Sequence, residues 1–146
     1  MDRALNYLAL ARKAGLAELG EEPVGAITRA GKGYLVVVAS DASDHTWRRA
    51  LSFVANTTQQ CIRVSYTKDE LGMAIGRTSL AMAAFTDPAL ALAFVKALDG
   101  QDAYREVLEA LEQKTKRVRQ RQDEAKAHQR NVRVGKIRRA PATKKD

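Results

Sequence analysis

Apolar residues follow two different spacings along the first two thirds of the chain. Apolar positions three or four residues apart predict helices in the segments 5–11, 24–30, 47–54, 71–75 and 90–98. Continuous or alternating runs rich in β-branched residues predict strands at 34–39, 62–66 and 80–85. Because strands and helices alternate from 34 to 98, we expect right-handed crossovers and a three-layer α/β/α sandwich. Its sheet should have three or four strands, with helices on both faces.

Several residues mark where these helices begin. Thr67 and Glu70 have the spacing of a capping box, and Asp87-Pro88 is typical of a helix start. Pro23 falls in the first turn of the helix predicted around 24–30, where a missing N–H costs nothing. These signals place the helix boundaries independently of the apolar spacing.

The chain changes character after residue 100. An apolar stripe predicts a helix that docks on the preceding body through Tyr104, Val107, Leu108 and Leu111. Basic residues then dominate, and the last segment combines glycine, proline and isolated charges. We therefore expect a domain over 1–100, a helical basic extension over 101–130, and a basic tail over 131–146 that is disordered until it binds a partner.

Positive charge is concentrated in this C-terminal part. The 146 residues include 25 Lys and Arg against 17 Asp and Glu, a formal net charge of +8. Residues 1–113 contain 12 basic and 14 acidic side chains, whereas residues 114–146 contain 13 and 3. Such a segment favours nucleic acid over the alternatives of a solubilising tail or a contact with anionic lipid. The candidate phosphate contacts are Lys114, Lys116, Arg117, Arg119, Arg121, Arg138 and Arg139.

Other classes of function find little support in the sequence. The single cysteine, Cys61, excludes an internal disulfide and a multi-cysteine metal site, and its apolar surroundings predict a buried thiol. No glycine-rich phosphate loop follows a predicted strand, so we expect no cofactor, no metal and no enzyme activity. We find neither a cleavage signature nor an apolar segment of membrane-spanning length. A soluble, cytoplasmic monomer that does not contact membranes is the expectation.

Three short segments carry side chains that suit a binding site. Glu21 and Glu22 are either an acid/base pair or partners of the helix dipole, and the dipole is the favoured interpretation. Asp41 follows the buried strand at its C-terminal edge, where it either faces a ligand or caps the turn. The loop of Gly76, Arg77, Thr78 and Ser79 suits an RNA backbone, or is an ordinary connector.

Three segments in order carry a resemblance to a known family: LALARKAGLAELGEE, YLVVVASDAS and LGMAIG…AMAAFTD. Over residues 5–98 the chain resembles the kink-turn RNA-binding family of ribosomal proteins, which includes the seven-Ae and thirty-e types of the large subunit. Its bacterial ribosomal, RNA-binding branch is the most similar. The resemblance implies a mixed four-stranded sheet, no enzyme activity and no cofactor. It also implies binding of kink-turns, which are sharply bent RNA duplexes with sheared G·A pairs.

The same resemblance implies roles for individual positions. Gly20 corresponds to the glycine at the start of the RNA-contacting helix, the next three residues to contact positions, and Ala26 to a contact lysine. Asp41 corresponds to an acidic residue after the buried strand, and 76–80 to a loop that holds bulged nucleotides. Glu22 and Pro23 stand where strong binders have Asn-Glu or Lys-Gln. Glutamate accepts hydrogen bonds from guanine but cannot donate them.

The sequence thus predicts a non-enzymatic RNA-binding protein that is associated with the ribosome or translation. A helix start and adjacent loops would recognise kink-turn-like RNA, and the basic tail would grip phosphates. The predicted RNA contacts in the body are Gly20, Glu21, Glu22, Lys32, Asp41, Gly76, Arg77, Thr78 and Ser79. The alternative is a protein-interaction module of the translation or transcription machinery in which kink-turn recognition is weakened.

Overall fold

The computed structural model describes residues 2–142, and the side chains of residues 2–129. It contains two compact units, the first ending at Glu112 and the second beginning at Gln113. Helix α6 starts in the first unit and continues into the second. The elements follow one another as α1 (Arg3–Lys13), β1 (Ala17–Leu19), α2 (Glu21–Arg29), β2 (Leu35–Val38), α3 (Asp44–Val54), β3 (Gln60–Arg63), α4 (Lys68–Ala74), β4 (Met82–Phe85), α5 (Pro88–Lys96), the 3-10 helix η1 (Gln101–Tyr104) and α6 (Arg105–Ala142).

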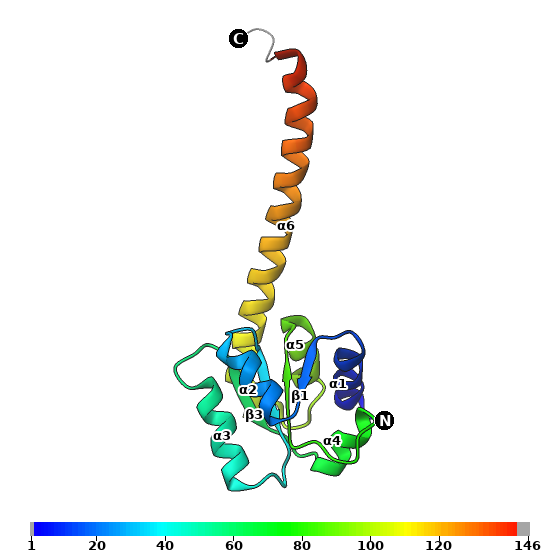
Figure 1. Ribbon diagram of the computed structural model, residues 1–146, viewed down its shortest axis with the longest axis vertical. Helices are drawn as coiled ribbons and strands as arrows, with labels where there is room; N and C mark the ends of the chain where they lie inside the picture. Colours follow the sequence, from blue (N-terminus) through cyan, green and yellow to red (C-terminus); the bar gives the residue numbers. More distant parts are fainter. Residues whose placement is uncertain (1, 143–146) are drawn as a thin grey trace. The chain divides into compact units, whose positions relative to one another are not determined.

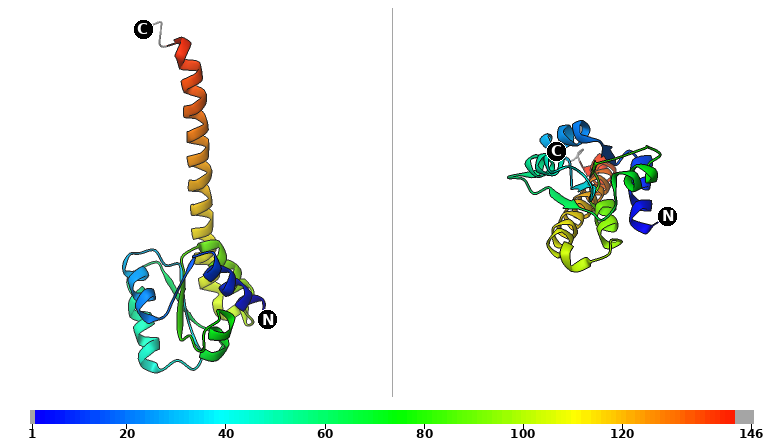
Figure 2. Two further views of the ribbon diagram at one scale, coloured as in Figure 1. Left: turned by 45° about the vertical axis from the view of Figure 1, so that its right-hand side comes forward. Right: turned by 90° about the horizontal axis from the view of Figure 1, so that it is seen from below.

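The first unit is built around a mixed sheet with the strand order β1-β4-β2-β3. Strands β2 and β3 are parallel, while β4 is antiparallel to both of its neighbours. Helices α2 and α3 cover one face, and α1, α4 and α5 cover the other (Figures 1 and 2). The predicted three-layer α/β/α fold with a small mixed four-stranded sheet is confirmed.

The two central strands are buried on both faces, which explains their apolar sequences. Every residue of β2 (LVVV) and of β4 (MAAF) is buried. The Phe85 ring continues the packing into the α5 layer, with its centroid 5.1 Å from that of Phe94. Small alanines in β4 let the flanking helices approach the sheet closely, while the branched residues of β2 fill the space beside them.

The edge strands differ from what the apolar pattern predicts. Strand β1 has only three residues, all half-buried, and so lacks the alternation that marks a longer strand. Strand β3 spans Gln60–Arg63 rather than 62–66, because parallel pairing sets Leu35 opposite Gln60. The chain still follows β2 briefly beyond this point, with a hydrogen bond of 2.9 Å from the Val64 N–H to the Val38 carbonyl.

The helix starts agree with the sequence signals. Thr67 and Glu70 form the complete capping box of α4, and the Asp87 carboxylate accepts the Leu90 N–H at the start of α5. Pro88 occupies the first turn of α5, as predicted. Short-range hydrogen bonds therefore fix several helix boundaries, and the apolar faces then dock these helices on the sheet.

The beginning of α6 packs on the first unit. Leu111 is fully buried, and Tyr104, Val107 and Leu108 pack against the core, which confirms the predicted docking stripe. Lys96 Nζ also lies 3.9 Å from Glu112 Oε1. The backbone is helical as far as Ala142, whereas the sequence leads us to expect disorder over 131–146. The predicted disorder of the tail before it binds a partner stays a prediction, and 143–146 lie outside the described residues.

Buried Gln59 ties the end of α2 to the start of the sheet. Its side-chain oxygen accepts the Gly33 N–H at 2.9 Å, and its side-chain nitrogen donates to the Thr28 carbonyl at 3.1 Å. Only 6% of Gln59 is exposed. Because both backbone groups are buried with it, they depend on this side chain for their hydrogen bonds.

We predict that Gln59→Leu lowers the free energy of unfolding by about 2–4 kcal/mol, since it leaves two buried backbone groups unpaired at about 1–3 kcal/mol each. Urea denaturation measures this change. The control is Gln60→Leu, because the amide of Gln60 donates to the Thr58 carbonyl at the surface. It should change stability by less than about 0.5 kcal/mol. Equal effects of the two substitutions would contradict the assignment.

Candidate nucleic-acid interface

Three chain segments that are far apart in sequence meet at one end of the sheet. The Gly20 N–H, just before α2, donates to the Met82 carbonyl at 2.9 Å. The Ala39 N–H, just after β2, donates to the Ala81 carbonyl at 3.0 Å. The start of α2, the loop after β2 and the loop before β4 therefore converge, as a shared binding site requires.

Gly20 gives the start of α2 an open backbone. Its φ of 100° and ψ of 160° lie in a region that is accessible almost only to glycine. No side chain caps this helix end, and the Gly20 carbonyl accepts the Val24 N–H at 3.0 Å. The N–H groups of the first helical turn have no partner within a helix, so this end of α2 presents donors and a partial positive charge.

Glu21 forms an ion pair with Arg49 of the neighbouring helix α3. Arg49 Nε lies 3.2 Å from Glu21 Oε1, but without the angle of a hydrogen bond. Both side chains are more than a third exposed, so water screens the contact and its contribution to stability is small. The Arg49 guanidinium also lies over the Phe53 ring, 5.6 Å from its centroid. The pair offsets one of the two negative charges beside the helix start.

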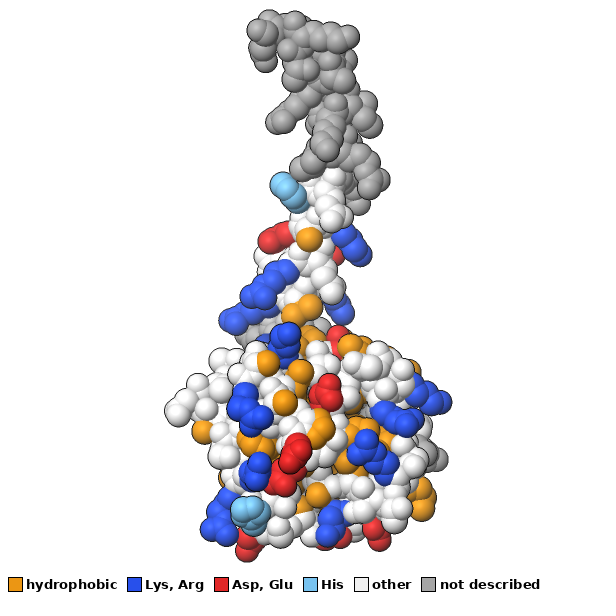
Figure 3. Space-filling view, in the orientation of Figure 1, with side chains coloured by type: hydrophobic (Ala, Val, Ile, Leu, Met, Phe, Trp, Pro, Cys, Tyr) orange, Lys and Arg blue, Asp and Glu red, His pale blue; other side chains and the backbone are white. Residues whose placement is uncertain are grey.

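A hollow of about 340 Å³ lies between α2 and α3, next to this ion pair. Its lining residues are Glu21, Glu22, Gly25, Ala26, Arg29 and Arg49. Carboxylates as acceptors and guanidinium groups as donors thus face the same space. Figure 3 shows carboxylates near the middle of the visible face of the body, with Lys and Arg side chains around them. Such a mixed surface suits base edges better than it suits bare phosphate.

Asp41 has a structural role at the edge of this site. Its Oδ1 accepts the Lys68 N–H at 2.8 Å, which joins the loop after β2 to the first turn of α4. The neighbouring Ser40 N–H donates to the Tyr66 carbonyl at 2.8 Å. The sequence left two interpretations of Asp41, a contact to a ligand or a cap of its own turn. The observed hydrogen bond is a cap, but it caps the start of α4 and not the turn that contains Asp41.

The loop before β4 is exposed but held firmly at its base. Gly76 has a φ of 73°, and the residues from Gly76 to Ser79 are all exposed. The Arg77 N–H donates to the Gly72 carbonyl at 2.8 Å. A Cβ atom on Gly72 would lie 2.7 Å from backbone atoms of Ser79, so only glycine at this position of α4 lets the loop pack so closely.

Other predicted contacts lie away from this end of the sheet. Lys32 follows the far end of α2, about 13 Å along the helix from Gly20 at 1.5 Å per residue. Among the predicted contacts in the second unit, four have exposed side chains: Lys116, Arg117, Arg119 and Arg121. Lys114 is half-buried, and burial followed by the charge of Arg117 lowers its pKa. The side chains of Arg138 and Arg139 lie outside the described residues.

The structure adds Arg29 and Arg49 to the residues that sequence analysis proposed. Arg49 belongs to a basic spot beside Trp47 that is visible in the sequence, but no sequence signal links either arginine to the start of α2. Their common position depends on the packing of α2 against α3, where Gly25 brings the two helices together. A Cβ atom on Gly25 would lie only 3.0 Å from the Phe53 ring.

The remaining candidate chemistry involves Cys61 and metal ligands. Burial raises the pKa of the half-buried Cys61 thiol to about 12, so the thiol form dominates at neutral pH. Across the described part of the chain, we find no cluster of three or more His, Cys, Asp or Glu side chains that would hold a metal ion. In that same part, every helix is too short or too polar to cross a bilayer.

Comparison with known proteins identifies similar folds. A structure of a protein of unknown function from Bacillus halodurans is 26% identical, with a TM-score of 0.63 over 68% of this chain and 99% of that chain. A 15.5 kD RNA-binding protein from Giardia lamblia is 17% identical, with a TM-score of 0.57 over 69% of this chain and 86% of that chain. No family profile and no curated protein matches the chain in sequence. Membership of the kink-turn ribosomal family therefore stays a prediction.

We predict that Gly72→Ala lowers the free energy of unfolding by about 1–2 kcal/mol. Alanine in a helix normally gains about 0.5–1 kcal/mol over glycine, but overpacking costs about 1–3 kcal/mol and here it acts on backbone. Thermal unfolding measures the loss, and hydrogen exchange at the Arg77 amide should accelerate. Met73→Ala, at the exposed neighbouring position, is the control. A stabilised Gly72→Ala variant would show that the loop does not pack on α4 as described.

Proposed function

We propose that this protein binds structured RNA through the converging end of its sheet, and that α2 supplies the central contact. The observation that carries the proposal is the open start of α2 at Gly20, flanked by two loops that backbone hydrogen bonds hold in place. Glycine lets another backbone approach closely, and the first-turn N–H groups then donate to phosphate or to base edges. The fold shared with an RNA-binding protein from Giardia lamblia supports the same conclusion.

The side chains around α2 favour recognition of bases over simple attraction to phosphate. Glu21 and Glu22 accept hydrogen bonds, and the amino and imino groups of guanine are donors that suit them. Arg49 and Arg29 donate to base or phosphate oxygens from the same hollow. Two carboxylates alone would repel an RNA backbone, so the arginines are needed for binding at this position.

The loop before β4 would complete the interface. Arg77, Thr78 and Ser79 offer one guanidinium and two hydroxyl groups on an exposed segment whose base is fixed by Gly72. Groups of this kind contact the sugar-phosphate backbone and so set the orientation of the RNA without recognising its sequence. In this arrangement α2 recognises the bent base pairs, and the loop holds the strand beside them.

The second unit would add affinity without specificity. Its described basic residues recur on more than one side of α6, since Lys114, Arg117 and Arg121 share one face and Lys116 and Arg119 another. A helix that is basic on several sides can contact phosphates of two strands at once. We propose a non-enzymatic role of this kind in ribosome-associated or translation-related RNA, with kink-turn-like RNA as the preferred shape.

We predict that Gly20→Asp abolishes any preference for kinked RNA over plain duplex of equal length. Aspartate adds a negative charge where RNA would approach and costs on the order of 1–3 kcal/mol of backbone strain. Competitive gel-shift or fluorescence-anisotropy titrations measure the preference. The matched control is Gly15→Asp, since Gly15 also has a positive φ (72°) and open space, but lies at the other end of β1.

In this test, both aspartate variants receive the same added charge, and unfolding curves confirm that each is folded at the assay temperature. Retained preference in Gly15→Asp together with loss in Gly20→Asp supports the site. Equal loss in both variants would point to a general charge effect and would sink the assignment to α2.

We predict that RNA affinity falls steeply with salt and that deletion of residues 114–146 makes the dependence shallower. Each neutralised phosphate contributes a log–log slope of about −0.9 for a duplex and about −0.7 for a single strand. Binding titrations over a salt series, with the full chain and the truncated chain, measure both slopes. Undetectable or salt-independent binding by the full chain would contradict the proposed function.

A further inference from the structure

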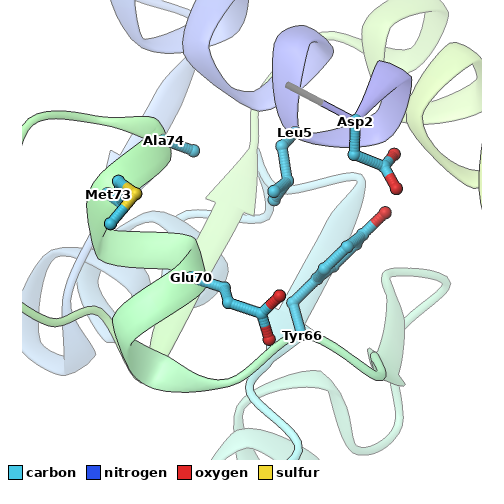
Figure 4. Close-up of a pocket in the computed structure, with 6 residues that line it drawn as sticks. All are labelled: Asp2, Leu5, Tyr66, Glu70, Met73 and Ala74. Atoms are coloured by element: carbon cyan, nitrogen blue, oxygen red, sulfur yellow. The ribbon is translucent and has the colours of Figure 1, made fainter.

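A second surface of the first unit has the properties of a protein-docking groove. It is a cavity of about 460 Å³ between α1 and α4, lined by Asp2, Leu5, Tyr66, Glu70, Met73 and Ala74. In Figure 4 Leu5 points from α1 into the space between Tyr66 on one side and Met73 and Ala74 of α4 on the other. The floor is therefore apolar, and the groove uses none of the residues of the proposed RNA interface.

Met73 is unusually exposed for an apolar side chain. It is 77% exposed, compared with 51% for Leu10 and 42% for Leu51, the other large apolar residues exposed among those described. Methionine is flexible and polarisable, which suits it to contact with a partner of varied shape. The exposed Met73 adjoins the nearly buried Leu5 and Ala74, so a ligand in the groove would cover a continuous apolar area.

Carboxylates surround one end of this apolar floor. The Tyr66 hydroxyl hydrogen-bonds to the Asp2 carboxylate, and Glu70 lies beside the same ring (Figure 4). The pKa of Tyr66 is raised mainly by burial. The hydrogen bond to Asp2 and the negative charges of Asp2, Asp99 and Glu70 raise it further. None of the six residues that line the groove is basic.

Asp2 and Glu70 each use one oxygen to cap a helix. Asp2 Oδ1 accepts the Ala4 N–H at 2.9 Å, and Glu70 Oε1 accepts the Thr67 N–H at 3.0 Å. A carboxylate has two oxygens that can each accept more than one hydrogen bond, so both groups keep capacity for a further donor. The helix caps also fix where these carboxylates lie, which lowers the entropy cost of binding a cation there.

We propose that the groove between α1 and α4 docks a short segment of a partner protein in which an apolar side chain lies next to Arg or Lys. The apolar residue would pack on Leu5 and Met73, and the basic group would reach Asp2 and Glu70. The carboxylates disfavour RNA here, because phosphates would meet negative charge and none of the residues that line the groove is basic. The protein would then hold RNA at one surface and a protein at another, so the inference goes beyond the proposed function.

Methionine methyl NMR of the full chain tests the groove directly. The chain has three methionines, Met1, Met73 and Met82, and Met82 is only 1% exposed, so its signal is an internal reference. The probe is a short peptide that places two leucines among arginines, and the matched control peptide has glutamate in place of every arginine. We expect the arginine peptide to shift the Met73 methyl signal in a saturable way, and the glutamate peptide to leave it unchanged.

Two charge-removing variants keep the helix caps and so separate binding from folding. Asp2→Asn and Glu70→Gln retain residue types that serve as an N-cap and in a capping box, respectively. Each should weaken peptide binding about two- to fivefold, in line with a partly exposed charge pair, and leave RNA affinity unchanged. RNA titrations of the same variants therefore distinguish failure of the groove from failure of the proposed RNA function.

Three outcomes would overturn the docking proposal. The first is a Met73 signal that does not respond to the arginine peptide. The second is an equal response to a single-stranded oligouridine, which would make the groove part of a nucleic-acid surface. The third is a Met73 signal that changes with protein concentration alone, which would assign the groove to contact between copies of this chain.

Discussion

The antiparallel pairing of β4 with both β1 and β2 fixes the position of every segment in the candidate RNA interface. The carbonyls of Ala81 and Met82, at the start of β4, accept N–H groups from Ala39 and Gly20, respectively. Because β4 is buried along its whole length, a slip by one residue would exchange its large and small side chains between two closely packed faces. The start of α2 and the two neighbouring loops are therefore brought together by the sheet.

Much of the fold follows from local sequence, and the exceptions have physical causes. The buried runs of β2 and β4, the capping box at Thr67 and the Asp87-Pro88 helix start are all visible in the sequence. Strand β1 is too short to show a period, and the register of β3 depends on its pairing with β2. The expectation of disorder beyond residue 130 rests on composition, namely Gly135, Pro141 and isolated charges, and it stays a prediction.

The candidate site was less predictable than the fold. Asp41 and the loop at Gly76 could be proposed as site residues because Asp41 follows β2 and the loop precedes β4. The actual partner of Asp41, the Lys68 N–H, and the ion pair between Glu21 and Arg49 arise from packing between elements that are distant in sequence. Lys32 illustrates the opposite case, since a basic residue in a turn after α2 is close in sequence to Gly20 but lies at the other end of the helix.

The close contact at Gly72 also has an evolutionary consequence. A helix position that admits no Cβ atom because a loop seven residues later occupies the space cannot vary independently of that loop. Related chains that carry a side chain at the position of Gly72 should therefore also have a longer or differently folded segment at 77–79. The length of this loop and the identity of one helical residue then form a single inherited unit, and variation in a segment of the proposed interface is limited by a residue outside it.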